Sequence, residues 1–380
     1  MSDRVYLDHN ATTPLHPDVV EAMVPVLRDG YGNPSSTHAE GAAAKRLVDR
    51  ARDQLAACLG AKPSEVVFTG GATEANNTVL FGLSGLPGKI VTSAVEHPSV
   101  TAPLEWLEAR DAEVVRLGVN DQGMIDLAEL DAALATPTKL VSIIWANNET
   151  GVVQPMVEIA ERVKAAGCLL HVDATQAVGK AVVDFNDVPA DFLSCSAHKF
   201  NGPKGIGCLV VREGTGCDSL LRGGPQERRF RGGTENVASI VAIGLAAQIA
   251  ADGLDDRIAN YGALRDRLWD AIKARIPDVR RNGDEASVLC NTISVEFCGA
   301  AGDVLLQSLD LEGVAVSAGA ACHSGSISPS HVLTAMGRSP EEALASLRLS
   351  VGLGNDSEQI DRAAYILESQ VAKVRAAGAS

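Results

Sequence analysis

Continuous apolar runs alternate with amphipathic helical patterns between about residues 65 and 212. The runs are EVVFTGG, KIVTSAV, KLVSIIWA, CLLHVDA, DFLSCSAH and IGCLVVR, and segments such as VEIAERVKAAG lie between them. Strands that are apolar along their whole length are typical of parallel sheets covered on both faces. The alternation therefore predicts an α/β fold with a mainly parallel central sheet and helices on both of its faces.

The pattern changes after about residue 255. A long amphipathic segment, DRIANYGALRDRLWDAIKARI, precedes the strand pattern NTISVEF, the helix pattern GDVLLQSLDLEG, the strand pattern LRLSVG and a last helix from about Asp356. Such a mixture indicates a smaller α+β domain. We expect a large domain at residues 15–255 and a small domain formed by residues 1–14 and 256–380.

One cysteine stands apart from the others. Cys322 lies in SAGAACHSG, a stretch of small residues without helical or strand period, which predicts a mobile loop. Structural thiols prefer apolar cores, and five cysteines lie in or beside strand-like runs: Cys168, Cys195, Cys208, Cys290 and Cys298. No CxxC pair occurs, so a zinc site is not expected. The pattern makes Cys322 the candidate reactive thiol.

Three further motifs suit a phosphorylated pyridine cofactor. Lys199 ends an apolar run, where open α/β sheets bind ligands, and a desolvated lysine can form a Schiff base. Asp173, at the end of HVDATQ, can keep a pyridine nitrogen protonated. FTGGATEANN predicts a strand, a glycine turn and a helix N-terminus with Thr73, which together bind phosphate. Lys204, in a GPKG turn, is interpreted as a surface residue. The combination indicates pyridoxal 5′-phosphate.

A series of segments in the same order resembles the NifS/IscS-like cysteine desulfurases, class-V aminotransferases of fold type I that use pyridoxal phosphate. The segments are YLDHNATTP, GNPSSTH, TGGATEANN, EHPSV, NNETGVVQP, HVDATQAVGK, SAHKFNGPKG, RGGTEN, SAGAACHSG and LRLSVG. The resemblance implies removal of sulfur from L-cysteine to give L-alanine and a persulfide on Cys322. A protein acceptor in iron–sulfur cluster assembly or thio-modification then takes the sulfur.

The resemblance also implies a role for each site residue. It makes Lys199 the lysine that binds the cofactor covalently, His97 the ring that stacks on it, and Cys322 the catalytic thiol. The other implied cofactor contacts are Asp173 at the ring nitrogen, Gln176 and Asn148 near the ring hydroxyl, and Ala72, Thr73, Ser196 and His198 at the phosphate. Asn33 and Arg348 are implied to grip the substrate carboxylate. No resident metal is implied, although Cys322 can serve as a transient iron–sulfur ligand.

The same resemblance implies a homodimer. Thr234, in RGGTEN, corresponds to a phosphate ligand supplied by the second subunit. The preceding segment at residues 222–233, RGGPQERRFRGG, is accordingly expected to reach the subunit interface.

Three alternatives remain open at this stage. A selenocysteine lyase shares the fold and cofactor, and GAACHS also resembles that group. An ordinary pyridoxal-phosphate aminotransferase needs no nucleophilic cysteine. The presence of both Lys199 and Cys322 argues against a catalytically inactive sulfur-relay or scaffold protein.

Charge and termini limit the partners. The net charge of −15 disfavours direct binding of nucleic acid, whose phosphates attract basic surfaces. The first residues, MSDRVYLDHN, show no signal-peptide pattern, and the most apolar stretch, Ser239–Ala251, is too short to span a membrane. We therefore expect a cytoplasmic enzyme without membrane contact.

Overall fold

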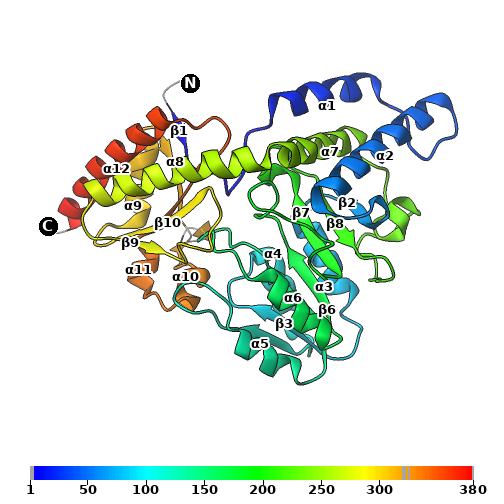
Figure 1. Ribbon diagram of the computed structural model, residues 1–380, viewed down its shortest axis with the longest axis horizontal. Coiled ribbons are helices and arrows are strands. Elements are labelled where there is room, and N and C mark those ends of the chain that lie inside the picture. Colours follow the sequence, from blue (N-terminus) through cyan, green and yellow to red (C-terminus); the bar gives the residue numbers. More distant parts are fainter. Residues whose placement is uncertain (1–3, 319–321, 324–325, 379–380) are drawn as a thin grey trace.

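The computed structural model describes residues 4–318, 322–323 and 326–378 (Figure 1). For residues 322, 323, 326 and 327 it describes the backbone alone.

A seven-stranded sheet forms the centre of the larger part, in the order β2-β8-β7-β6-β5-β3-β4. The strands are β2 (Val66–Thr69), β3 (Lys89–Ser93), β4 (Val114–Leu117), β5 (Thr138–Ile144), β6 (Leu169–Asp173), β7 (Phe192–Ser196) and β8 (Gly207–Val211). Neighbouring strands are parallel except where β8 pairs with β2 and β7. The connection at residues 197–206 carries only a short 3-10 turn, η2 (Ala197–Lys199), and is too short for a crossover, so β8 turns back beside β7.

Helices cover both faces of this sheet. They are α1 (Pro17–Asp29), α2 (Ala39–Leu59), α3 (Ala72–Gly82), α4 (Pro98–Glu108), α5 (Leu127–Leu134), α6 (Met156–Ala165) and α7 (Val237–Asp252). Along β8, Cys208 and Val210 pack with α2 and α7, whereas Leu209 and Val211 pack with α3 and α4. Helix α1 lies along α7 (Figure 1). The predicted mainly parallel, doubly covered sheet is confirmed.

The C-terminal part builds a second sheet in the order β12-β15-β10-β9. Its elements are α8 (Leu254–Arg275), β9 (Val279–Asn282), β10 (Thr292–Phe297), α9 (Gly302–Leu311), β11 (Val314–Ala315), β12 (Ser317–Ala318), β13 (Cys322–His323), β14 (Ser326–Ile327), α10 (His331–Ala335), α11 (Pro340–Leu344), β15 (Ser346–Ser350) and α12 (Ser357–Gly378). The expected strands, the long helix and the last helix all form.

The N-terminus belongs to the core of this second part. β1 (Val5–Tyr6) pairs with β11, and Val5 and Leu7 are buried among side chains of α8, α9, α12 and β10. This separate hydrophobic cluster supports the expected domain division at residues 14/15 and 255/256, which stays a prediction.

The segment that carries Cys322 connects β12 of the second sheet to α10, which packs against the large domain. It follows β12, which pairs with β15, and the short strands β13 and β14 pair with each other. After it, Val332, Leu333 and Met336 around α10 pack against Val95 and Ile144. The predicted mobility of the loop concerns residues 319–321 and 324–325 and the Cys322 side chain, which lie outside the described residues.

Among the helices that the structure describes, none alone has the length and apolar content needed to cross a bilayer. Helices α7 and α8 meet those requirements only when taken together, and they are bent by 74° relative to each other.

Candidate active site

A cavity of about 610 Å³ lies where β2, β5, β6 and β7 end, on one edge of the central sheet. Ligands of open α/β sheets bind at the carboxyl ends of the strands. The predicted residues that line it are Ala72, Thr73, His97, Asn148, Asp173, Gln176, Ser196, His198 and Lys199. Residues predicted from separate sequence motifs therefore line the same cavity.

Backbone carbonyls of the N-terminal segment accept hydrogen bonds from the candidate lysine, Lys199. Lys199 ends η2 (Ala197–Lys199), a single 3-10 turn directly after β7. Its Nζ donates to the backbone carbonyls of Asn10 at 2.6 Å and Ala11 at 2.9 Å. Burial lowers the pKa of Lys199 to about 8. A larger share of this amine is therefore unprotonated near neutral pH than is usual for lysine, and the neutral amine is the form that attacks a carbonyl.

Asp173 is a buried carboxylate whose described hydrogen-bond donors are all neutral. It ends β6 and is 3% exposed. Its Oδ1 accepts from the backbone N–H of Thr175 at 2.9 Å, and its Oδ2 accepts from Asn76 Nδ2 at 2.8 Å. No ion pair joins Asp173 to a basic side chain within the described ranges. Because burying an unpaired charge is costly, this part of the cavity suits a cationic N–H donor.

His97 both caps a helix and lines the cavity. Its Nδ1 accepts the backbone N–H of Ser99 at the start of α4, at 3.0 Å, and lies 2.8 Å from Ser99 Oγ. The neutral ring therefore carries its proton on Nε2. Asn76 Nδ2 donates to Ser99 Oγ at 2.9 Å and also to Asp173. A chain of hydrogen bonds thus connects the imidazole to the buried carboxylate.

The first turn of α3 forms the opposite wall. Gly71 is its N-cap residue, with φ of 146°, and no side chain caps the helix. The first-turn N–H groups and the helix dipole therefore favour an anion. Gly207 in β8 lies against this turn, because a Cβ there would come within 2.7 Å of Gly71 Cα. Ser196 and His198 complete this wall from the end of β7.

Arg348 lies beside a second cavity of about 570 Å³ that shares His97 and Asn148 with the first. Ala318 and residues 328–331 also line it, so the described residues on both sides of the cysteine segment border this space. The predicted sulfur chemistry therefore has a place beside the cofactor cavity.

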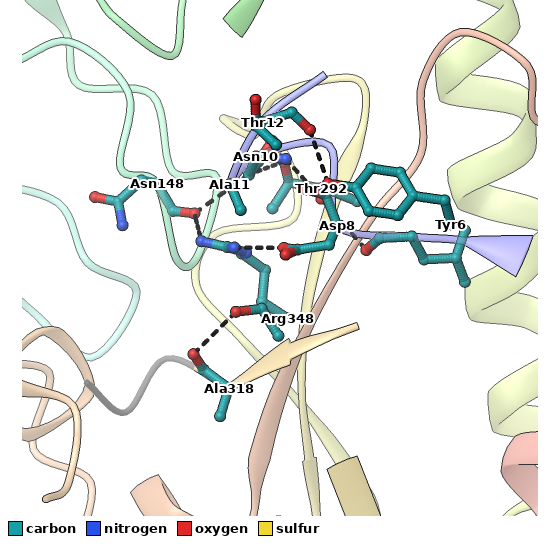
Figure 2. Close-up of polar contacts among 12 residues, drawn as sticks. Tyr6, Asp8, Asn10, Ala11, Thr12, Asn148, Thr292, Ala318 and Arg348 are labelled. Carbon is teal, nitrogen blue, oxygen red and sulfur yellow. Dashed lines mark hydrogen bonds and ion pairs between the residues drawn. The ribbon is translucent and has the colours of Figure 1, made fainter. Parts of the chain in front are cut away.

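The guanidinium of Arg348 is positioned by two loops (Figure 2). Its Nη2 donates to Asp8 Oδ1 at 2.7 Å, and its Nη1 donates to the backbone oxygen of Asn148 at 2.9 Å. Arg348 is 7% exposed, and its Nε is buried without a hydrogen-bond partner among the residues that the structure describes. A guanidinium that lines this cavity suits a carboxylate ligand.

Besides Arg348, which lines the second cavity, three predicted residues are not placed at the first cavity. Asn33 and Thr234 are exposed, and Asn33 Oδ1 accepts from the backbone N–H of Ser35 at 2.9 Å. The Cys322 side chain lies outside the described residues.

A family model described as Aminotransferase class-V matches residues 5–363. The chain belongs to the class-V aminotransferase family. A cysteine desulfurase of Nostoc sp. (strain PCC 7120) is 45% identical over 375 residues, which cover 98% of this chain and 94% of the relative. A solved NifS-like protein matches with a TM-score of 0.91 at 34% identity, covering 97% of this chain and 100% of the other.

A solved structure of SspA in complex with cysteine matches this class-V aminotransferase with a TM-score of 0.81 at 34% identity, covering 91% and 98% of the two chains. The predicted family and fold type are confirmed by these likenesses.

Class-V aminotransferases of the cysteine desulfurase type use pyridoxal 5′-phosphate. The residues present fit this group. The uncapped turn of α3 suits its phosphate, and the unpaired Asp173 suits a protonated ring nitrogen. Thr175 also lines the cavity with a buried Oγ1 that has no partner in the structure. Lys199, with its lowered pKa, suits the aldehyde.

Several residues of this class-V aminotransferase site were missed from the sequence. Asn76 and Ser99 lie inside motifs that were used only for Thr73 and His97. An asparagine in the apolar helix ANNTVLFGL was a usable signal, because buried amides need partners. Lys204, interpreted as a surface residue, is exposed but lines the cavity.

We predict that His97 titrates below the ordinary histidine pKa of 6.5, because burial lowers it, and that its neighbours move it in opposite directions. The Lys199 charge lowers the pKa of His97 and the Asp173 charge raises it. In the cofactor-free chain, NMR titration should show a higher His97 pKa in Lys199→Met and a lower one in Asp173→Asn. Lys204→Met is the matched control. Equal His97 pKa values in all four proteins would contradict this electrostatic description.

Proposed function

We propose that the protein is a pyridoxal-phosphate-dependent cysteine desulfurase that releases L-alanine and carries the sulfur as a persulfide on Cys322. The observation that carries the proposal is the pairing of two adjoining cavities. One contains Lys199, with its lowered pKa, and the unpaired Asp173, and the other is bordered by both ends of the Cys322 segment. The names of the relatives, and the cysteine bound in one solved structure, support the same conclusion.

Residues of the first cavity carry out the proton transfers. The bound cofactor supplies an electron sink for the charge that develops when the substrate Cα loses its proton. Lys199 would hold the cofactor covalently, and its Nζ would accept the Cα proton of the substrate. Asp173 would keep the ring nitrogen of the cofactor protonated. The imidazole of His97 offers its Nε2–H to the cavity. Arg348, which lines the second cavity, receives the substrate carboxylate through its guanidinium group.

The sulfur chemistry falls to Cys322. Its thiolate attacks the sulfur of L-cysteine, the S–S bond forms as the Cβ–S bond breaks, and the electron pair left on carbon takes up a proton. The sum is L-cysteine plus thiol giving L-alanine plus persulfide, so no outside oxidant or reductant is consumed. The persulfide passes to a protein acceptor of an iron–sulfur or thio-modification system. A reducing compartment such as the cytoplasm suits a cycle that starts from a free thiol.

The proposed assembly is a homodimer in which Thr234 reaches the phosphate turn of the second subunit. Its exposure on one chain, away from the cavity, supports this arrangement. The segment before it is held to its own chain, since Glu227 pairs with Arg52 at 2.7 Å and Arg231 pairs with Glu74 at 3.1 Å. Thr234 is therefore displayed from a supported loop. Asn33 stays a predicted contact of the substrate carboxylate.

The thiol assignment predicts that Cys322→Ala forms no alanine or sulfide from L-cysteine yet binds pyridoxal phosphate as tightly as the wild type. The reason is that the cofactor contacts lie in the other cavity. Alanine production and a cofactor titration measure the two properties. Cys168→Ala, which changes a partly exposed cysteine next to β6, should keep wild-type turnover. Full turnover by Cys322→Ala would refute the assignment, and turnover of L-selenocysteine alone by the wild type would identify a selenocysteine lyase.

The shared site predicts complementation between two defective chains. Lys199→Ala and Thr234→Ala homodimers are each impaired, but a heterodimer has one site with both changes and one intact site. Mixing the two under conditions of subunit exchange should restore alanine production. Lys199→Ala mixed with itself is the control. No recovery in proven heterodimers would show that Thr234 serves its own chain or no site at all.

A further inference from the structure

Lys180 is a buried lysine with no carboxylate partner among the described side chains. It is 5% exposed and lies in the turn after β6, four residues beyond Gln176. Its Nζ donates to Gln176 Oε1 at 2.6 Å. A small hollow behind the main cavity is lined by Lys180 together with the cationic side chains of Lys199 and Arg257. Burial lowers the pKa of Lys180 to about 7.

A buried cation without a counter-charge destabilises a fold. An apolar side chain of similar length would fill this position without that desolvation penalty. The hydrogen bond from Lys180 to Gln176 connects this buried cation to the main cavity.

The Gln176 amide is held at both ends. Its oxygen accepts from Lys180, and its Nε2 donates to the backbone carbonyl of Asn10 at 2.9 Å. The protonated form of Lys180, which predominates below its pKa of about 7, can only donate, so it excludes the flipped amide, in which Nε2 would face Nζ. Gln176 is 2% exposed and lines the main cavity. The second N–H of Gln176 Nε2 is therefore left to donate to a ligand in the main cavity.

Asn10 links this pair to the candidate lysine. The same carbonyl oxygen accepts from Gln176 Nε2 and from Lys199 Nζ, at 2.9 and 2.6 Å. A rotated amide would present its oxygen to this carbonyl and repel it. The position of Lys180 thus affects the segment on which Lys199 rests.

We propose that Lys180 is a positioning residue, whose ammonium group locks the Gln176 amide so that the cavity receives an N–H donor for an anionic ring oxygen of the cofactor. The inference rests on the proposed function, because pyridoxal phosphate is the ligand it concerns. Lys180 is not among the residues that line the main cavity, and it acts through Gln176. The ammonium also polarises the amide, which strengthens its N–H as a donor.

The test is a double-mutant cycle in the full-length chain, with pyridoxal phosphate itself as the probe. Lys180→Met should weaken cofactor affinity about tenfold, the effect of one charge-assisted hydrogen bond. The same change in a Gln176→Ala background should produce no further loss. Urea unfolding of the cofactor-free Lys180→Met chain should show a midpoint equal to or above that of the wild type, because a desolvated charge has been removed.

Lys89→Met is the matched control. Lys89 is also 5% exposed, and its Nζ also donates to a neutral oxygen, Thr136 Oγ1, but it lies in β3 away from Gln176. It should leave cofactor affinity unchanged. Lys180→Gln, a shorter neutral side chain that can still donate, should recover part of the affinity that Lys180→Met loses.

Unchanged affinity in Lys180→Met overturns the proposal, and so does an equal loss in the Gln176→Ala background. A lowered unfolding midpoint together with a loss of affinity that Lys180→Gln does not relieve would identify a merely structural lysine and would also overturn it. If the wild-type chain itself fails to bind pyridoxal phosphate, the proposed function falls first, so the two failures are distinguishable.

Discussion

The positions of Lys199 and Gln176 depend on one shared hydrogen-bond acceptor, the backbone carbonyl oxygen of Asn10. It accepts hydrogen bonds from Lys199 and Gln176, which come from two different strand ends. The segment that carries it connects the two hydrophobic cores, because Leu7 is buried in the C-terminal one and Thr13 bonds to the backbone of His198 beside β7. Packing of the chain's first residues therefore fixes where the reactive amine lies.

Burial sets the charge state of this site. Desolvation lowers the pKa of Lys199 to about 8 and that of His198 to about 4, and it also lowers the pKa of His97. The basic groups around the cavity are thus shifted toward their neutral forms, which can attack a carbonyl or accept a proton. Asp173 supplies the negative charge, and the ion pair between Asp8 and Arg348 places a guanidinium at the border with the second cavity.

Sequence reasoning worked best where chemistry follows directly after a strand. Lys199 and Asp173 could be predicted because strand ends of a parallel sheet meet at one edge, and Thr73 because a glycine turn precedes its helix. Contacts between distant segments had no such local signal. Asp8 and Arg348 are 340 positions apart, and Lys180 has no motif that marks a buried lysine. The prediction for Thr234 cannot be judged from one chain, since its expected partner is a second copy.

The central claim is that one chain divides proton chemistry and sulfur transfer between adjoining cavities, with Cys322 as the sulfur carrier. Mass spectrometry after a single turnover tests it most directly. Holoenzyme mixed with one equivalent of L-cysteine, without reductant, should yield alanine in equal amount and one added sulfur atom on the peptide that contains Cys322. Alanine released without added sulfur on that peptide, or with the sulfur on another cysteine, would contradict the account.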